Sequence, residues 1–220
     1  MTKPMLAILL LLAAAMLPSG ATAQNKSAPK SPPAAKAKAE TLTLPPHAAG
    51  PKDASIVIEV WSDFECPHCK ELYLRTLRRV IEDYCAAGKV YLIHRDFPLP
   101  QHAHAREASR WASAAATVGK YEEVTEALFT NQEIWSVNGN IEATVAPVLG
   151  ADLAKVKQVM TAHKDEIEAA IESDLFLGHQ AGVGQTPTTK ISQKGAMLSL
   201  SPGNFPYATL KSYLDSQLAK

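Results

Sequence analysis

The chain has 220 residues, of which 46% are hydrophobic, so it is long enough for one domain with a sizeable core. Its 22 basic and 22 acidic side chains balance to a formal charge of zero. Because neutralising phosphates requires a basic surface, this balance argues against nucleic-acid binding.

Residues 1–23 have the pattern of a secretory signal peptide. Lys3 supplies a positive start, residues 5–17 are an unbroken apolar run, and Ala21-Thr22-Ala23 offers small residues for cleavage before Gln24. A membrane anchor is the alternative, but about 13 apolar residues fall short of the ~20 that a spanning helix needs. We therefore expect export into an oxidising, extracytoplasmic compartment such as the periplasm.

Residues 24–50 are rich in proline, alanine, lysine and serine and contain no aromatic residue. Such a composition cannot bury enough apolar surface to offset the entropy lost on ordering. We predict a disordered tether here, followed by a folded domain over residues 51–220.

A strand–helix–strand succession opens the predicted domain. The β-branched run at residues 55–61 predicts a buried strand, and residues 66–86 predict a helix that Gly88 ends. Residues 89–94 predict a second strand. This order favours a parallel pair of strands joined by a right-handed crossover.

Residues 101–183 lack a convincing strand. Helical spacing of apolar residues recurs in five segments: 102–118, 121–129, 141–149, 153–162 and 166–178. The β pattern then returns in residues 188–193 and 196–200, which flank a turn at Lys194-Gly195. Residues 206–218 predict a final amphipathic helix.

Cys66-Pro67-His68-Cys69 lies where the first strand meets the first helix, a position that indicates thiol–disulfide exchange. Cys66 starts the helix, where unpaired N–H groups and the helix dipole favour a thiolate. We predict that Cys66 is the nucleophile and that Cys69 resolves the mixed disulfide. A static, unreactive disulfide is the alternative. A structural zinc site would need two more ligands, and Cys85 is the only other cysteine, so the sequence argues against zinc.

His68 lies between the two cysteines, where its imidazole can stabilise the Cys66 thiolate; a solvent-facing turn residue is the alternative. Stabilising the thiolate stabilises only the reduced form, so the disulfide becomes a stronger oxidant. A thiol pKa of ~4 stabilises the reduced state at pH 7 by ~4 kcal/mol, which raises the potential by about 90 mV. This sign favours an oxidase.

Cys85 makes the number of cysteines odd. It follows Cys69 on the predicted helix at a distance of about 24 Å, beyond the ~7 Å reach of a disulfide. We predict a buried core thiol, with intermolecular pairing as the alternative. His94, His102 and His104 could suggest a metal site, but His102 and His104 diverge on a helix, so we expect no metal. The aromatic residues of the helical block are expected in its core: Trp111, Tyr121, Phe129 and Trp135.

Together these features resemble the DsbA-like branch of the thioredoxin superfamily, which consists of periplasmic thiol–disulfide oxidoreductases. The resemblance is carried, in family order, by residues 50–54, 62–70, 94–99, 128–132 and 182–188. A lone C-x-x-C is weak evidence, but a Thr-Pro about 120 residues later makes the match specific. The resemblance implies an α/β thioredoxin fold with two halves, 51–100 and 184–220, separated by an all-helical insertion, 101–183.

The resemblance also implies that Pro187 is the superfamily's cis-proline and faces the C-x-x-C. Thr186, Pro187 and Pro67 would then support the site, with the Thr186 backbone pairing with an extended substrate strand. A redox-active Cys66–Cys69 disulfide would take the place of any cofactor.

One position departs from the family pattern. Relatives commonly carry a buried acidic residue six positions before the first cysteine, and Val60 occupies that position here. Glu59 points to the other face of the strand by period 2. Either Glu59 shifts to serve, or water or another group handles the proton.

The expected partners are reduced or misoxidised exported proteins. Family analogy adds a membrane quinone-linked reoxidase, of the DsbB or vitamin K epoxide reductase (VKOR) kind, and a monomeric state. An isomerase or reductase is an alternative, although family isomerases usually carry an N-terminal dimerisation domain for which the tether is too short. A copper(I)-binding or chaperone-like module with Cys66 and Cys69 as soft ligands is the other alternative.

Overall fold

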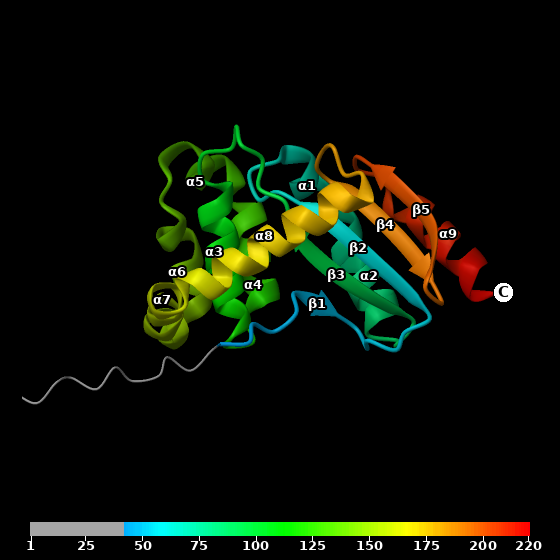
Figure 1. Cartoon of the computed structure of the whole chain (residues 1–220), viewed down its shortest axis with the longest axis horizontal. Helices are drawn as coiled ribbons and strands as arrows, with labels where there is room; N and C mark the ends of the chain where they lie inside the picture. Colours follow the sequence, from blue (N-terminus) through cyan, green and yellow to red (C-terminus); the bar gives the residue numbers. More distant parts are fainter. Residues whose placement is uncertain (1–41) are drawn as a thin grey trace, which may run out of the picture. The chain divides into compact units, whose positions relative to one another are not determined.

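The computed structural model describes residues 42–220, which contain a five-stranded sheet with strand order β1-β3-β2-β4-β5 (Figure 1). The strands are β1 (Ala48–Ala49), β2 (Ile56–Ser62), β3 (Val90–Asp96), β4 (Thr188–Gln193) and β5 (Ala196–Pro202). β2 is parallel to β3 and antiparallel to β4, and β4 and β5 form a hairpin. The predicted parallel pair of strands and the predicted hairpin are both confirmed.

β2 is the central strand of the sheet, and other elements cover both of its faces. On one face its side chains are completely buried: Ile56, Ile58 and Val60. On the other face, Trp61 is 1% exposed and its Nε1 donates to the Asp174 carbonyl of α8 (Lys164–Ala181) at 3.1 Å. The end of this strand is therefore held rigidly where the C-x-x-C begins.

A single helical stretch joins β2 to β3. It consists of α1 (Pro67–Leu72) and α2 (Arg78–Val80), each followed by a wider π-type turn, Tyr73–Leu77 and Ile81–Cys85. The sequence predicted its extent but not these wider turns, which rotate the following residues relative to a regular helix. The C-terminal helix α9 (Tyr207–Leu218) packs beside it, while α8 crosses the opposite face of the sheet (Figure 1).

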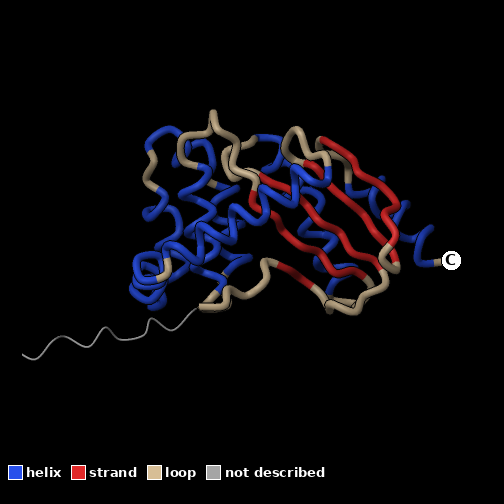
Figure 2. The backbone as a smooth tube through the Cα atoms, in the orientation of Figure 1, coloured by secondary structure: helices blue, strands red, loops and turns tan. Residues whose placement is uncertain are grey.

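The chain between β3 and β4 is helical, as predicted; most of its helices gather at one end of the sheet, and α8 runs from there across one face (Figure 2). Besides α8, these helices are α3 (Ala105–Ala116), α4 (Tyr121–Thr130), α5 (Gln132–Asn138), α6 (Ile141–Leu149) and α7 (Leu153–Ala162). A short 3-10 turn, Gly150–Asp152, links α6 to α7. Of the four aromatic residues predicted in the core of the insertion, Trp111, Phe129 and Trp135 are buried, and Tyr121 is partly buried and packs against the core.

The beginning of the described chain corrects the predicted tether. Ala48–Ala49 pairs with β3, and His47 is only 8% exposed, so the fold begins before residue 51. A two-residue strand is too short to show an apolar period, which is why the composition misled the prediction. The predicted signal peptide, residues 1–23, lies outside the described residues, as does the tether up to residue 41. Within residues 42–220, no helix has the length and apolar character needed to cross a membrane.

Candidate active site

Cys66 is the N-cap residue of α1, with extended backbone angles of φ −76° and ψ 120°. Pro67 follows in the first turn, where its missing N–H costs nothing and its ring favours the helix. The N–H groups of Cys69 and Lys70 donate to the Cys66 carbonyl at 3.0 and 3.1 Å. Both active-site cysteines therefore lie in the first turn of the helix, as predicted.

This environment lowers the pKa of the Cys66 thiol from 9.0 to about 5. The largest cause is a hydrogen bond from the Cys69 side chain; burial opposes it, and the Thr186 side chain and the N–H groups of Cys69 and His68 add to it. All these donors favour the charged sulfur. At pH 7, Cys66 is accordingly a thiolate.

Cys69 has the opposite character. It is 1% exposed, and burial, followed by the hydrogen bond to Cys66 and the charge on it, raises the pKa of Cys69 well above its ordinary value. One ionised and one protonated sulfur suit a nucleophile and a resolving thiol respectively. Both cysteines are free thiols in this structure, so their predicted disulfide stays a prediction.

The Thr186-Pro187 loop lies directly against Cys66. The peptide bond between Thr186 and Pro187 is cis, and Cys66 Sγ lies 3.4 Å from the Thr186 carbonyl oxygen, to which it donates when protonated. The implied cis-proline and its position facing the C-x-x-C are thus confirmed. The Thr186 hydroxyl is buried without another hydrogen-bond partner among residues 42–220, so it is free to donate to the thiolate. Pairing of this loop with a substrate strand stays a prediction.

The His68 side chain is exposed to solvent. His68 lowers the pKa of Cys66 through its backbone N–H, which donates to the Cys66 sulfur, rather than through its imidazole. The predicted role of the imidazole therefore stays a prediction, whereas the backbone contribution follows from the position of His68 in the first turn of α1.

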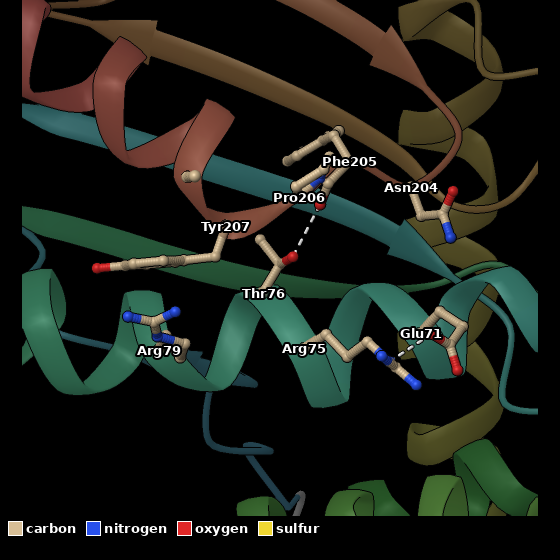
Figure 3. Close-up of a pocket in the computed structure, with 9 residues that line it drawn as sticks. Glu71, Arg75, Thr76, Arg79, Asn204, Phe205, Pro206 and Tyr207 are labelled. Carbon is tan, nitrogen blue, oxygen red and sulfur yellow. Dashed lines mark hydrogen bonds and ion pairs between the residues drawn. The ribbon is translucent and has the colours of Figure 1, made fainter.

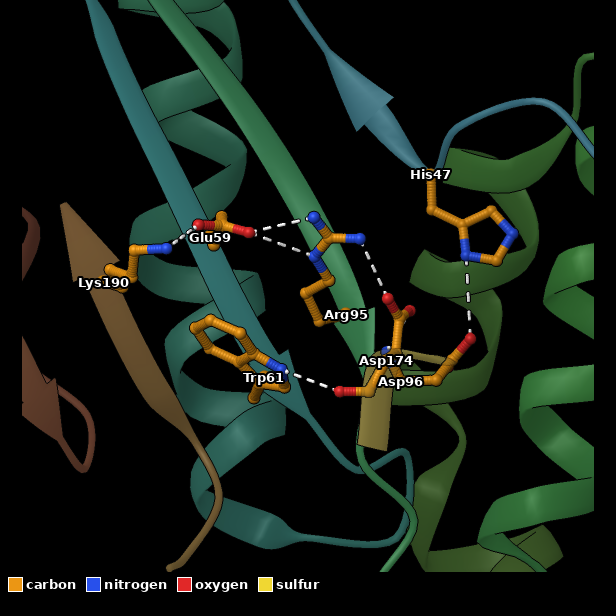
Figure 4. A network of polar contacts seen from close by, with 7 residues as sticks. All are labelled: His47, Glu59, Trp61, Arg95, Asp96, Asp174 and Lys190. Carbon is orange, nitrogen blue, oxygen red and sulfur yellow. Dashed lines mark hydrogen bonds and ion pairs between the residues drawn. The ribbon is translucent and has the colours of Figure 1, made fainter. Parts of the chain in front are cut away.

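Glu59 lies among Arg95, Asp174 and Lys190, and Val60, the next residue of β2, points to the opposite face of the sheet (Figure 4). Arg95 contacts it at 2.9 Å and Lys190 also pairs with it, while Arg95 makes a second ion pair with Asp174. Burial raises the pKa of Glu59, but the hydrogen bonds from Lys190 and Arg95 outweigh burial, and the carboxyl pKa is lowered. Glu59 is therefore a structural ion-pair partner and does not replace the acid missing at Val60.

Two buried polar residues that the sequence did not identify as site residues support the active-site loop. Gln132, at the start of α5, donates from Nε2 to the carbonyls of Phe64 (2.6 Å) and Cys66 (3.1 Å). The N–H of Asp63 donates to Cys69 Sγ at 3.4 Å. Two features of the sequence could have pointed to them. Gln132 belongs to one of the segments that carry the family resemblance, and Asp63 lies between the first strand and the C-x-x-C.

The remaining cysteine and the three histidines belong to separate environments. Cys85 is 4% exposed and burial raises its pKa to about 11, which confirms a buried core thiol. The histidines contact different acidic residues: His94 contacts Glu122, His102 contacts Asp63, and the His104 N–H contacts Glu65. Among the residues that the structure describes, no group of three or more potential ligands could hold a metal ion.

A pocket of about 520 Å³ lies between the first helix and the loop that precedes α9 (Figure 3). Its lining residues are Glu71, Arg75, Thr76, Arg79, Asn204, Phe205, Pro206, Tyr207 and Ala208. The Thr76 hydroxyl donates to the Phe205 carbonyl at 2.8 Å, and the Gly203 N–H donates to the Pro187 carbonyl at 2.7 Å. The pocket wall is thereby anchored both to the first helix and to the cis-proline loop.

A family profile described as Thioredoxin matches residues 43–215. The chain belongs to the thioredoxin family. This thioredoxin-family protein is similar in fold to the thiol–disulfide exchange protein α-DsbA2 from Wolbachia pipientis, with 24% identity over 78% of this chain and 87% of that chain and a TM-score of 0.66. The catalytic domain of Proteus mirabilis ScsC is 24% identical, with a TM-score of 0.64, and the match covers 80% of this chain and 90% of that chain. Bacillus subtilis BdbD is 18% identical, with a TM-score of 0.63, and the match covers 80% of this chain and 94% of that chain. The predicted DsbA-like fold with a helical insertion is confirmed.

The curated relatives of this thioredoxin-family protein include longer chains. They include Na⁺/H⁺ antiporters NhaA 1 from Mycolicibacterium gilvum, 29% identical over 150 residues, and Mycolicibacterium vanbaalenii, 29% identical over 144 residues. These matches cover 67% and 64% of this chain but only 23% and 22% of the antiporters. The chain thus spans less than a quarter of the length of these relatives.

Proposed function

We propose that this protein is a thiol–disulfide oxidoreductase that donates a Cys66–Cys69 disulfide to reduced client proteins. A client thiolate attacks Cys66 Sγ, and Cys69 leaves as a thiolate that takes up a proton. A second client thiolate then attacks the client sulfur of the mixed disulfide and releases Cys66 as a thiolate. The client loses two electrons and the protein gains them. The observation that carries this proposal is the placement of Cys66 at the N-cap of α1, against the cis Thr186-Pro187 peptide and beside the buried Cys69, which lowers the pKa of Cys66 and raises that of Cys69.

The sign of the pKa shift supports an oxidase. Only the reduced protein holds the Cys66 thiolate, so whatever stabilises that charge favours reduction of the disulfide. With a pKa of about 5, ionisation at pH 7 stabilises the reduced form by two units, or about 2.7 kcal/mol. For a two-electron couple this corresponds to about 60 mV toward a more oxidising potential.

A redox equilibrium with glutathione tests this direction. At pH 7 we expect a reduction potential about 50 mV or more above the roughly −270 mV of thioredoxin, whose attacking thiol has a pKa near 7. Between about pH 5 and 9, reduction adds one proton, because Cys69 is protonated while Cys66 stays ionised. The potential then falls by about 30 mV per pH unit, and below pH 5 by about 60 mV.

The same equilibrium in a Cys85→Ala variant is the control, because it leaves a single dithiol couple. A potential at or below that of thioredoxin, with no change of slope near pH 5, contradicts the oxidase and favours the isomerase or reductase. Tight stoichiometric copper(I) binding together with poor turnover of a dithiol peptide favours the copper-binding alternative, for which Cys66 and Cys69 supply the soft ligands.

The proposed setting is extracytoplasmic, and the expected clients are reduced or misoxidised exported proteins. An apolar N-terminal run followed by small residues supports export. Among proteins of similar fold is one from Salmonella enterica described as periplasmic, with a TM-score of 0.58. Donation of a disulfide consumes it, so a reoxidising partner is required, and a membrane quinone-linked enzyme of the DsbB or VKOR kind is our proposal. The pocket between the first helix and the loop that precedes α9 offers a surface for client segments.

A further inference from the structure

A buried carboxylate lies beside the cysteine pair, although not at the position occupied by Val60. The Asp63 side chain is completely buried in the turn between β2 and α1. Its oxygens accept hydrogen bonds from the N–H groups of Glu65 and Leu99, each at 2.7 Å, and from His102 Nδ1 at 2.8 Å. The carboxylate thus ties the active-site turn to the segment that follows β3.

The backbone of Asp63 reaches both cysteines. Its carbonyl accepts from the Cys66 N–H at 3.1 Å, and its own N–H donates to Cys69 Sγ at 3.4 Å. A donor directed at a sulfur favours the thiolate over the thiol. This N–H lowers the pKa of Cys69, whereas burial and the Cys66 sulfur raise it. The orientation of the Asp63 peptide therefore affects how readily Cys69 carries charge.

Cys69 must carry that charge whenever it resolves a mixed disulfide. The Cys69 thiol first releases its proton to solvent. Its thiolate then attacks Cys66 Sγ, a Cys66–Cys69 bond forms, the bond from Cys66 to the outer sulfur breaks, and the outer sulfur leaves as a thiolate. A buried thiol pays a large desolvation penalty on ionisation, so each fixed donor at Cys69 Sγ accelerates this step.

We propose that Asp63 and His102 are positioning residues for this resolving step. The Asp63 carboxylate, held at Oδ2 by the Leu99 N–H and His102 Nδ1 and at Oδ1 by the Glu65 N–H, fixes the Asp63 N–H on Cys69 Sγ. His102 is 23% exposed, so it closes the network at the protein surface without entering the thiol site. The inference rests on the proposed exchange chemistry and extends it to residues outside the C-x-x-C.

Rapid mixing of the reduced protein with oxidised glutathione separates the two steps. Cys66 first forms a mixed disulfide with glutathione, and Cys69 then displaces the second glutathione; acid quenching and mass measurement quantify each species. In Asp63→Asn we expect resolution to be about tenfold slower with the first step unchanged within twofold. Loss of one charge-assisted hydrogen bond is worth about this factor.

His102 provides a milder pair of variants that keeps the test decisive if Asp63→Asn does not fold. His102→Leu removes the donor to Asp63, so resolution is expected to slow several-fold, whereas His102→Gln retains an N–H donor and restores most of the rate. The matched control is Asp174→Asn. Asp174 is also buried and accepts a backbone N–H, that of Asp96, at 3.0 Å, but it contacts no residue of the cysteine turn.

The outcomes are distinct. Slow resolution in Asp63→Asn and His102→Leu, with Asp174→Asn unchanged, supports the positioning role. Equal resolution rates in the wild type, Asp63→Asn and His102→Leu overturn the role and leave the exchange activity intact. If the wild-type protein forms no mixed disulfide at all, the proposed function itself fails, and the positioning role fails with it.

Discussion

Replacing Cys66 with serine is expected to abolish disulfide transfer to a dithiol peptide, with a loss of at least about a thousandfold. Loss of a covalent nucleophile commonly costs this much or more. The Cys66 sulfur is ionised near neutral pH because its pKa is about 5, and a serine hydroxyl neither ionises in this range nor forms a disulfide. The rate of peptide oxidation, followed as loss of free thiol, measures the effect.

Cys69→Ser and Cys85→Ala complete this experiment. The serine hydroxyl at position 69 can still donate to the Cys66 thiolate, so Cys66 still attacks oxidised glutathione and one glutathione leaves as a thiolate. The mixed disulfide of Cys66 with the other glutathione then accumulates, because no Cys69 thiol is present to resolve it. Cys85→Ala is the matched control, because burial raises the pKa of that thiol to about 11 and leaves it without nucleophilic character at neutral pH. Wild-type activity in Cys66→Ser, or loss of activity in Cys85→Ala, contradicts the assignment of the cysteines.

Gly50→Ala is expected to cause a large loss of stability. Gly50 has φ +86°, and an added Cβ would lie 2.1 Å from the Val90 carbonyl oxygen and 3.2 Å from Cys85 Cβ. The left-handed backbone costs an alanine about 1–2 kcal/mol, and the clash with backbone adds about 1–3 kcal/mol. Thermal or denaturant unfolding of the variant measures the sum, about 2–5 kcal/mol.

Gly119→Ala isolates the clash from the backbone conformation. Gly119 has φ +74°, but nothing lies within 4 Å of an added Cβ. We therefore expect Gly50→Ala to be at least about 1 kcal/mol more destabilising than Gly119→Ala. If the two variants lost equal stability, the segment before residue 51 would not be packed against β3 and the first helix. That result would restore the tether that the composition of residues 24–50 predicted.

The elements with a strong apolar period could be predicted from sequence, whereas the short ones could not. Strand β2 and the long helix after Cys66 have clear patterns, and period 2 placed Glu59 and Val60 on opposite faces of the sheet. β1 has two residues and α5 has seven, with Ile134 and Val137 exposed rather than buried. Segments this short are determined by tertiary contacts, which their own residues do not encode locally.

The role of Cys66 could be predicted from the local order of strand and helix. The residues that hold the active-site turn in place could not be predicted. A helix N-terminus follows directly from the strand-to-helix order, so Cys66 could be identified as the nucleophile. The contacts of Gln132 with Cys66 and of His102 with Asp63 join residues 66 and 39 positions apart. Such pairings depend on how the helical insertion folds back onto the first strand. The sequence therefore argued against a metal ligand at His102 but could not show that this residue is the partner of a buried carboxylate.

The measurement that tests the account most directly is an ultraviolet titration of thiolate absorbance in the reduced protein, with Cys66→Ser as the reference. The donors from Cys69, Thr186 and the first turn of α1 predict one thiolate that appears with a midpoint near pH 5 and is missing from the reference. A Cys66 thiol that ionises only near its ordinary pKa of 9 would contradict the account.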